Sequence, residues 1–207
     1  MPIDPALWQK LTLKSSKEAW PVIVDHVIDI ASRPLTKGTA SSEIVKRDRE
    51  IGIIDHFLTS SGWDLWCTFS NDVERTAVKL AKWWDQPFTA KAVLILDGLS
   101  LREIPWLIQG AKEHGFELHG CSAHASELPS ETNEFARALG FSSRSQLQSN
   151  GAGQSHKLQP ARTECVDLPW KDCEGLIKSD SGAKNCIFWH HWPDSKVHDG
   201  SGAGQGL

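Results

Sequence analysis

Apolar residues recur at helical spacing throughout the first part of the chain. Positions three and four apart are apolar over residues 20–31, 42–62 and 71–84, and this period predicts three helices. Glu74 lies three positions after the start of the last stretch, which is the spacing of a capping box at a helix start. We therefore expect residues 1–90 to form a helical N-terminal region.

The pattern changes after residue 90. Residues 92–96 form an uninterrupted apolar run, AVLIL, that ends at Asp97 and Gly98. A run of this kind predicts a strand that is buried on both faces of a parallel sheet. Ser100 follows, with Glu103 three positions later, and this pair predicts a capped helix directly after the strand.

Predicted strands and helices alternate along the rest of the chain. Short apolar runs indicate the strands, and stretches with helical periodicity lie between them. This alternation predicts an α/β domain over residues 91–199, with a mostly parallel sheet flanked by helices. The predicted elements are strands at 116–121, 165–168 and 186–189, a helix over 130–140 that opens at Ser130, and a short helix over 171–178.

Two segments of the second half lack apolar periodicity. Residues 142–161 are rich in Ser, Gln, Gly and Asn, so we expect a mobile loop rather than part of the core. Residues 200–207 are Gly-rich and polar, and we expect them to form a flexible tail. The predicted organisation is thus a helical region, an α/β domain and a tail.

The composition is that of a globular protein, because 40% of the 207 residues are apolar and 23% are charged. The formal net charge of −4 lacks the strongly basic balance of a protein that holds duplex DNA through phosphate contacts. The five cysteines include no CxxC pair, which favours reduced, mostly buried thiols. No stretch approaches the roughly 20 consecutive apolar residues of a membrane span, and residues 1–10 do not resemble a signal peptide. We therefore expect a cytoplasmic protein with no membrane partner.

Two polar clusters fall where an open parallel sheet binds ligands, beyond the carboxyl ends of its strands. Asp97, in LILDGLS, directly follows the first predicted strand, and Gly98 lets the backbone turn sharply beside a ligand. Ser130 and Thr132, in LPSETNEFAR, lie at a predicted helix start, where free amide protons favour an anion such as phosphate. The alternative is that neither cluster binds a ligand: Asp97 would then only cap a turn, and Ser130 would only cap a helix.

The third polar cluster follows the last predicted strand, in the segment FWHHWPDSKVHDG. Imidazole and carboxylate ligands at this density suit Zn²⁺ or a similar divalent ion. Asp194 and His198 are four residues apart, within reach of one metal. A solvated loop that is rich in His and Asp by accident is the alternative. The cluster consists of His190, His191, Asp194, His198 and Asp199.

Together the clusters supply the parts of a metal-assisted phosphoryl transfer: metal ligands, a hydroxyl nucleophile and helix amides for phosphate oxygens. The order of three motifs along the chain resembles that of the PglZ domain; the motifs are DGLS, LPSETNEFAR and DSKVH. This domain is a branch of the alkaline phosphatase superfamily found in bacterial phage-exclusion systems and in some signalling effectors. The resemblance runs over residues 91–199 and implies an alkaline-phosphatase-like fold.

The resemblance also implies roles for individual residues. Thr132 matches the family's nucleophile, and Asp97 matches a ligand of one metal ion. Asp194 and His198 match the DxxxH pair that binds the other ion. In the implied mechanism Thr132 attacks phosphorus in line between two divalent ions, with zinc expected, and water then releases the phospho-enzyme. The implied substrate-binding residues are Arg137 and Asn133.

The chain departs from the family pattern at the end of the site. Family members complete the two-metal site with a later Asp-His pair and a further His, and neither follows Asp199. The resemblance therefore implies either the front part of a longer protein or a degenerate copy, and an incomplete or inactive enzyme in both cases. His190 or His191 is the candidate replacement for a missing ligand.

Our leading hypothesis from the sequence is a metal-dependent phosphomonoester or phosphodiester hydrolase of PglZ type that acts in phage defence. Its expected partners are a phosphoester, such as a nucleotide or oligonucleotide, and other phage-defence proteins. The alternative is a non-catalytic scaffold subunit of a defence complex, which would dock partners through surface tryptophans. A flavodoxin-like nucleotide-binding domain is a third hypothesis, but DGLS lacks its phosphate-cradling Gly-rich loop. The candidate docking residues are Trp63, Trp66, Trp83 and Trp84.

Overall fold

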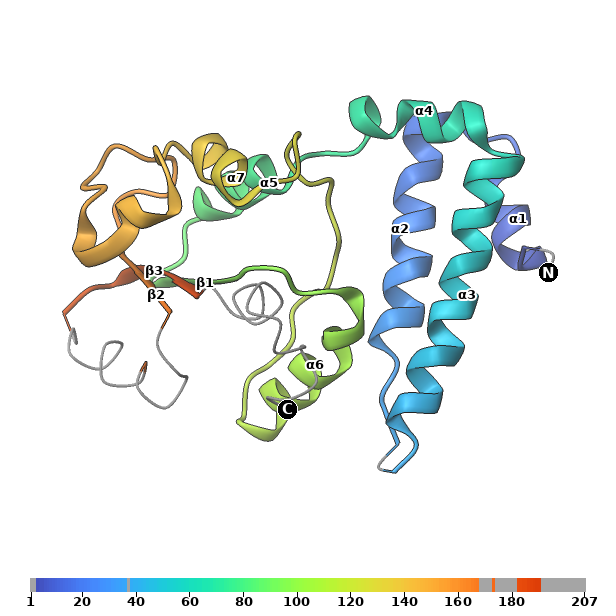
Figure 1. Ribbon diagram of the computed structural model, residues 1–207, viewed down its shortest axis with the longest axis horizontal. Helices are drawn as coiled ribbons and strands as arrows, with labels where there is room; N and C mark the ends of the chain where they lie inside the picture. The colour runs from blue at the N-terminus through green and yellow to red at the C-terminus, as the bar shows by residue number, and fades with distance from the viewer. Residues whose placement is uncertain (1–2, 37, 168–172, 174–181, 191–207) are drawn as a thin grey trace. The chain divides into compact units, whose positions relative to one another are not determined.

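The chain forms two compact units (Figure 1). Residues 100–125 belong with the N-terminal helices, whereas the sequence pattern suggested that they continue the α/β domain. The computed structural model describes residues 3–36, 38–167, 173 and 182–190. The first unit comprises Met1–Glu74 and Ser100–Ala125, and the second comprises Arg75–Leu99 and Ser126–Leu207.

The first unit is helical, as the apolar period predicts. The long helices α2 (Ser16–Ser32) and α3 (Ala40–Ser60) pack against each other, and α4 (Trp63–Asp72) packs against both. α2 begins at a capping box in which Glu18 accepts hydrogen bonds from both the backbone and the hydroxyl of Ser15. The unit also contains α1 (Pro5–Leu11), the 3₁₀ turn η1 (Leu101–Glu103) and α6 (Ile104–Glu113). Its buried core consists of Leu7, Trp20, Ile23, Ile30, Ile54 and Leu58.

Two predictions for this part of the chain are wrong. The helix expected over residues 71–84 ends where predicted but begins only at Thr76 (α5, Thr76–Trp84), because residues 71 and 72 belong to α4 and Val73 and Arg75 adopt extended backbone angles. Asn71, where the predicted helix was expected to start, lies inside α4, so the predicted capping box with Glu74 does not form at that position. The carbonyl of Glu74 accepts a hydrogen bond from the Ala125 amide. Residues 116–121 form no strand, and Phe116 is 70% exposed, because no strand lies beside this segment within the described chain.

The second unit is α/β, with a small sheet whose described strands all run parallel in the order β1-β3-β2. Helices α5 and α7 (Thr132–Leu139) lie together over one face of this sheet (Figure 1). Trp84, Leu139 and Trp189 are buried between the helices and that face. On the opposite face Leu94 is 56% exposed, so β1 is not buried on both faces as predicted. The strands are β1 (Lys91–Leu96), β2 (Arg162–Val166) and β3 (Asn185–His190).

The segment expected to be a mobile loop, residues 142–161, is instead part of the core. It contains the 3₁₀ segment η2 (Arg144–Asn150), and the side chains of Leu147 and Leu158 are fully buried. The hydroxyl of Thr163 in β2 donates to the carbonyl of Leu147 at 3.0 Å. The segment has no apolar periodicity because irregular turns, and not a regular helix or strand, place these two leucines in the core. Polar side chains form hydrogen bonds with its backbone N–H and C=O groups.

Helix α7 begins and ends close to the predicted positions. Its first residue is Thr132, and the capping residue is Glu131 rather than the expected Ser130. The helix ends at Gly140, which has a φ of +94°. A Cβ atom at Gly140 would lie 3.2 Å from the Cα of His156, so a glycine is needed both for the left-handed turn and for close packing.

His156 is buried beside this turn and is expected to make the second unit sensitive to acid. Burial lowers the pKa of its imidazole, and a backbone hydrogen bond with Gly153 offsets part of this effect. Its Nδ1 atom accepts a hydrogen bond from the Leu158 amide at 3.2 Å, which requires that nitrogen to be unprotonated. Because the unfolded chain binds the proton more readily, the free energy of unfolding should fall as pH drops below about 6.5, by up to about 1.4 kcal/mol per pH unit.

Urea unfolding at a series of pH values measures this slope. His156→Phe keeps a ring beside Phe141, whose centroid lies 4.8 Å from that of His156, and it removes the titrating group. The variant should therefore lose less stability between pH 7.5 and pH 5.5 than the unmodified chain does. An identical slope for the two proteins would exclude His156 as the cause.

Other sequence-based expectations are settled only in part. None of the five cysteines forms a disulfide, and Cys67 and Cys121 are exposed rather than buried. No helix in the described part of the chain has both the length and the apolar character needed to cross a membrane. Apart from Cys173, the helix expected over 171–178 lies outside the described residues, and so does the tail over 200–207.

Candidate functional site

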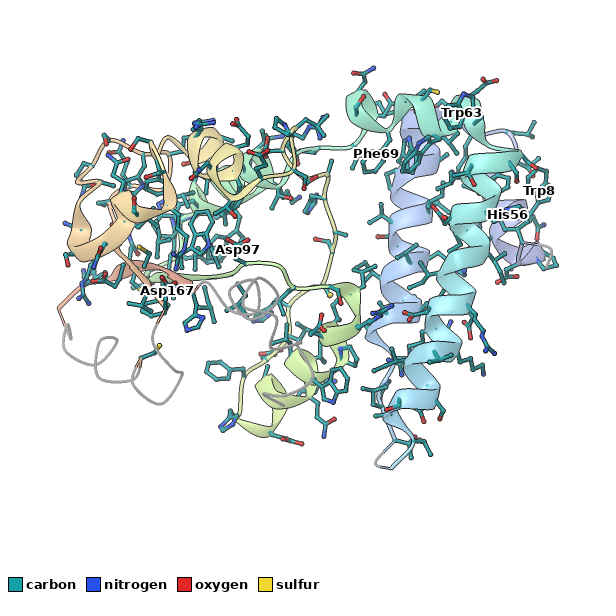
Figure 2. All side chains as sticks on the ribbon, in the orientation of Figure 1. Trp8, His56, Trp63, Phe69, Asp97 and Asp167 are labelled. Atoms are coloured by element: carbon teal, nitrogen blue, oxygen red, sulfur yellow. The ribbon has the colours of Figure 1, made fainter. Side chains whose placement is uncertain are left out.

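The carboxyl ends of the strands meet at one edge of the sheet, because the strands are parallel. The register places Leu96 of β1 beside His190 of β3, and His190 beside Val166 of β2. Asp97 and Asp167 directly follow the two outer strands, and Figure 2 labels both. We call this row of residues the carboxyl edge. Open parallel sheets bind ligands at such an edge.

Asp97 connects the carboxyl edge to helix α7. Its amide donates to the carbonyl of His190 at 3.3 Å, which extends the pairing of β1 and β3 by one residue. Gly98 then turns the chain, with a φ of +78°. The Oγ1 atom of Thr132 donates to Oδ2 of Asp97 at 3.0 Å. The fold thus brings together two candidate residues that lie 35 positions apart in the sequence.

Thr132 also lies where a helix offers positive charge. It is the first residue of α7 and is partly buried. The side chain of the capping residue Glu131 makes no capping hydrogen bond to this helix. The amide of Glu134 already donates to the carbonyl of Glu131 at 3.1 Å, so a ligand would be bound by the amides that precede it, those of Thr132 and Asn133. The helix dipole adds a partial positive charge at the same place. A hydroxyl, a carboxylate and a helix N-terminus therefore lie together beside the carboxyl edge.

The two predicted substrate-binding residues are exposed on α7. Asn133 directly follows Thr132. Arg137 lies in the last turn of the helix, where its Nη1 atom forms an ion pair with Glu134. A separation of five residues places Arg137 about 140° around the helix axis from Thr132. The guanidinium is therefore paired with a helix neighbour and lies on a different side of α7 from the hydroxyl.

The expected metal ligands are only partly within the described chain. Asp194, His198 and the alternative ligand His191 lie outside it. No three His, Cys, Asp or Glu side chains come close enough together to hold a metal within residues 3–36, 38–167, 173 and 182–190. The oxygen atoms of Asp97 and Thr132 are hard donors 3.0 Å apart, and they fit two positions around one divalent cation. These two residues are thus compatible with part of a metal site.

An arginine and an aspartate that the sequence argument missed also lie at the carboxyl edge. Arg144 of η2 is largely buried, and its Nη2 atom donates to Oδ1 of Asp167 at 2.8 Å. The same nitrogen donates to the carbonyls of Val166 and Trp189 at 3.0 and 3.3 Å. Arg144 therefore ties the ends of β2 and β3 together. Asp167 directly follows a strand, as Asp97 does, and this position could have identified it from the sequence. Arg144 could not be identified in this way, because it lies in a segment that was predicted to be a loop.

The four tryptophans considered for partner docking have different environments. Trp84 is buried in the core of the second unit, and its indole N–H donates to the carbonyl of Gln159, so it is not available as a docking residue. Trp63 of α4 is 57% exposed, and Trp66 and Trp83 are also exposed to a lesser degree. Trp66 is stacked on Phe69, with ring centroids 5.6 Å apart. Trp63 is therefore the most accessible of the four.

The described geometry at the carboxyl edge is that of an α/β ligand site: an aspartate after a strand, a threonine at a helix start and a hydrogen bond between them. The same fold occurs in proteins that catalyse different reactions, so the fold alone does not identify the reaction. Comparisons of the chain with protein-family models, with curated proteins and with solved structures found no match.

Proposed function

We propose that the carboxyl edge is the centre of a metal-dependent phosphoester hydrolase of PglZ type, with Thr132 as the nucleophile and Asp97 beside it. The observation that supports this proposal is the hydrogen bond of 3.0 Å between Thr132 Oγ1 and Asp97 Oδ2. The proposal includes an alkaline-phosphatase-like fold for the second unit.

The side chains at the carboxyl edge have complementary roles in this chemistry. Asp97 accepts the hydrogen of the Thr132 hydroxyl and so fixes the direction of the Oγ1 lone pairs. The amides of the first α7 turn point toward the space where phosphate oxygens would lie. A divalent cation, when held by the oxygens of Asp97 and Thr132, supplies positive charge that favours the ionised hydroxyl.

The proposed phosphoryl transfer has two steps. In the first step, the Thr132 oxygen forms a bond to phosphorus while the ester P–O bond breaks, and the alcohol leaves with the proton. In the second step, a water oxygen forms a bond to phosphorus while the bond between phosphorus and Thr132 Oγ1 breaks. Phosphate leaves (or a phosphomonoester, when the substrate is a diester), and a proton from the water restores the Thr132 hydroxyl. The proposed substrate is a phosphomonoester or phosphodiester such as a nucleotide or oligonucleotide, met in the cytoplasm in the course of phage defence.

Asp97→Asn is the experiment that tests the site. The change keeps the size of the side chain but removes its charge, so zinc affinity should fall by about 10–100-fold, measured by isothermal titration calorimetry. Hydrolysis of bis(p-nitrophenyl) phosphate in the presence of Zn²⁺ should fall by a similar factor. Asp55→Asn, a matched change at an exposed residue of α3, should alter neither quantity. Unchanged zinc affinity in Asp97→Asn would remove this residue from the metal site.

The same titration addresses the scaffold hypothesis, which the exposure of Trp63 favours. A scaffold that keeps the fold without its chemistry needs no metal. Failure of the unmodified chain to bind Zn²⁺, Mn²⁺ or Mg²⁺ would therefore contradict the hydrolase proposal and support the scaffold. Tight binding of two ions per chain would favour the hydrolase.

A further inference from the structure

The helical unit contains a pocket of about 360 Å³ that the hydrolase proposal does not use. Its apolar walls come from α1, α3 and α4, and they include Trp8, Leu11, Phe57 and Leu65. The rings of Trp8 and Phe57 meet edge to face, with centroids 5.9 Å apart. Figure 2 shows Trp8 on α1, next to α3, and this side chain is 52% exposed. This volume and this apolar lining are those of a small-molecule site.

The charged groups at the pocket are few and come from two places. Lys14, in the turn between α1 and α2, and Asp64, in the first turn of α4, are its only charged lining residues in the described chain. Lys10 and Lys17 lie on either side of Lys14, and residues 10–17 contain no acidic side chain. Glu18 follows directly and interacts electrostatically with Lys14. Three lysines against this one carboxylate leave the α1–α2 turn with a net positive charge, which attracts an anion at the pocket mouth.

The same turn holds an apolar residue that the core does not use. Leu13 is fully exposed and has a φ of +68°, a left-handed backbone conformation that is unfavourable for a leucine. It lies between Thr12 and Lys14, both of which line the pocket. Apolar surface and positive charge are thus combined at the mouth of an apolar pocket.

We propose that this pocket binds a small anionic amphiphile, such as a medium-chain carboxylate. The alkyl chain lies against Trp8, Leu11 and Leu65, where it is removed from water. The carboxylate lies at the mouth and pairs with Lys14. Asp64 also lines the pocket and repels a carboxylate, so it limits the affinity for an anion. The inference does not depend on the proposed hydrolase function.

Decanoate and decyltrimethylammonium are suitable probes, because they share an alkyl chain and carry opposite charges. Isothermal titration calorimetry of the full chain, below micelle-forming concentrations, should show one decanoate per chain, bound at least about fivefold more tightly than the cation. Equal affinities would overturn the anionic preference. Absence of decanoate binding, or many weak sites per chain, would overturn the pocket.

Charge variants assign the head-group contact. Lys14→Gln should weaken decanoate about three- to fivefold, and Asp64→Asn should strengthen it about two- to threefold, because both groups are exposed and screened. Lys46→Gln, at an exposed site on α3 away from the lining, is the matched control and should leave affinity unchanged. Equal effects of Lys14→Gln and Lys46→Gln would show a non-specific charge effect and overturn the assignment.

A wall variant tests the apolar contact. Trp8→Ala should weaken both probes at least about fivefold, because the alkyl chain loses a large apolar neighbour. Thermal melting checks that this variant is folded. Unchanged affinity for both probes in a folded Trp8→Ala protein would place the alkyl chain elsewhere, and the exposed charge variants test the proposal even if Trp8→Ala unfolds.

Discussion

Thr132→Ala is expected to lower kcat/KM for bis(p-nitrophenyl) phosphate by about 10³-fold or more, while the zinc bound per chain falls less than it does in Asp97→Asn, because a neutral hydroxyl is a weaker ligand than a carboxylate. The reason is that a methyl group cannot form a bond to phosphorus, whereas the carboxylate of Asp97 remains in place. The measurement is a steady-state assay in Zn²⁺ together with elemental analysis of the purified variant.

Two further variants separate a nucleophile from a structural hydroxyl. Thr132→Ser keeps the oxygen and should retain activity to within about tenfold. Thr59→Ala removes an exposed hydroxyl in the last turn of α3 that donates to backbone carbonyls, and it should leave activity unchanged. Acid quenching with labelled substrate should trap phosphate on the unmodified chain but not on Thr132→Ala. Persistent hydrolysis by Thr132→Ala would mean that another group attacks phosphorus.

The parts of the fold that could be predicted are those governed by local signals. The apolar period predicted α2 and α3 because each helix buries one face against its neighbour. The run AVLIL predicted β1, and the Ser100–Glu103 pair predicted the start of the following helical segment. Both signals are contained within a few residues, so no knowledge of distant contacts was needed.

The predictions failed where distant contacts decide the structure. Residues 142–161 have no apolar period, yet Leu147 and Leu158 are buried, because the partners that cover them come from β2 and α7. The segment 116–121, FELHGC, was predicted as a strand, but a strand also needs a neighbour, and the described chain supplies none. Sequence patterns alone could not supply this information.

The candidate site shows the same division. Asp97 and Thr132 could be predicted because each ends or begins a regular element in a recognisable way. Their contact depends on how α7 packs on the sheet, and only the structure provides it. Arg144 could not be predicted, since its guanidinium binds two strand-end carbonyls and Asp167 through contacts that no local motif encodes.

Leu139→Ala should have the largest effect on stability, because it removes a fully buried side chain from the helix that carries Thr132. Large-to-small changes at such positions cost about 2–5 kcal/mol, since both burial and packing are lost. Hydrogen exchange measured by mass spectrometry should show faster exchange in α5, α7 and the strands, which share this core. Urea unfolding gives the size of the loss.

The loss of hydrogen-exchange protection in Leu139→Ala should be confined to the second unit, because the core around Leu139 and the core around Ile54 have no residue in common. Amides of α2 and α3 should therefore keep their protection in Leu139→Ala, whereas Ile54→Ala should affect those helices instead. Val78→Ala, at an exposed position of α5, is the matched control and should change stability by no more than about 0.5 kcal/mol. Equal loss of protection in both units after Leu139→Ala would show that the whole chain unfolds cooperatively. In that case the position of Thr132 would depend on the stability of the whole chain, and not on that of the second unit alone.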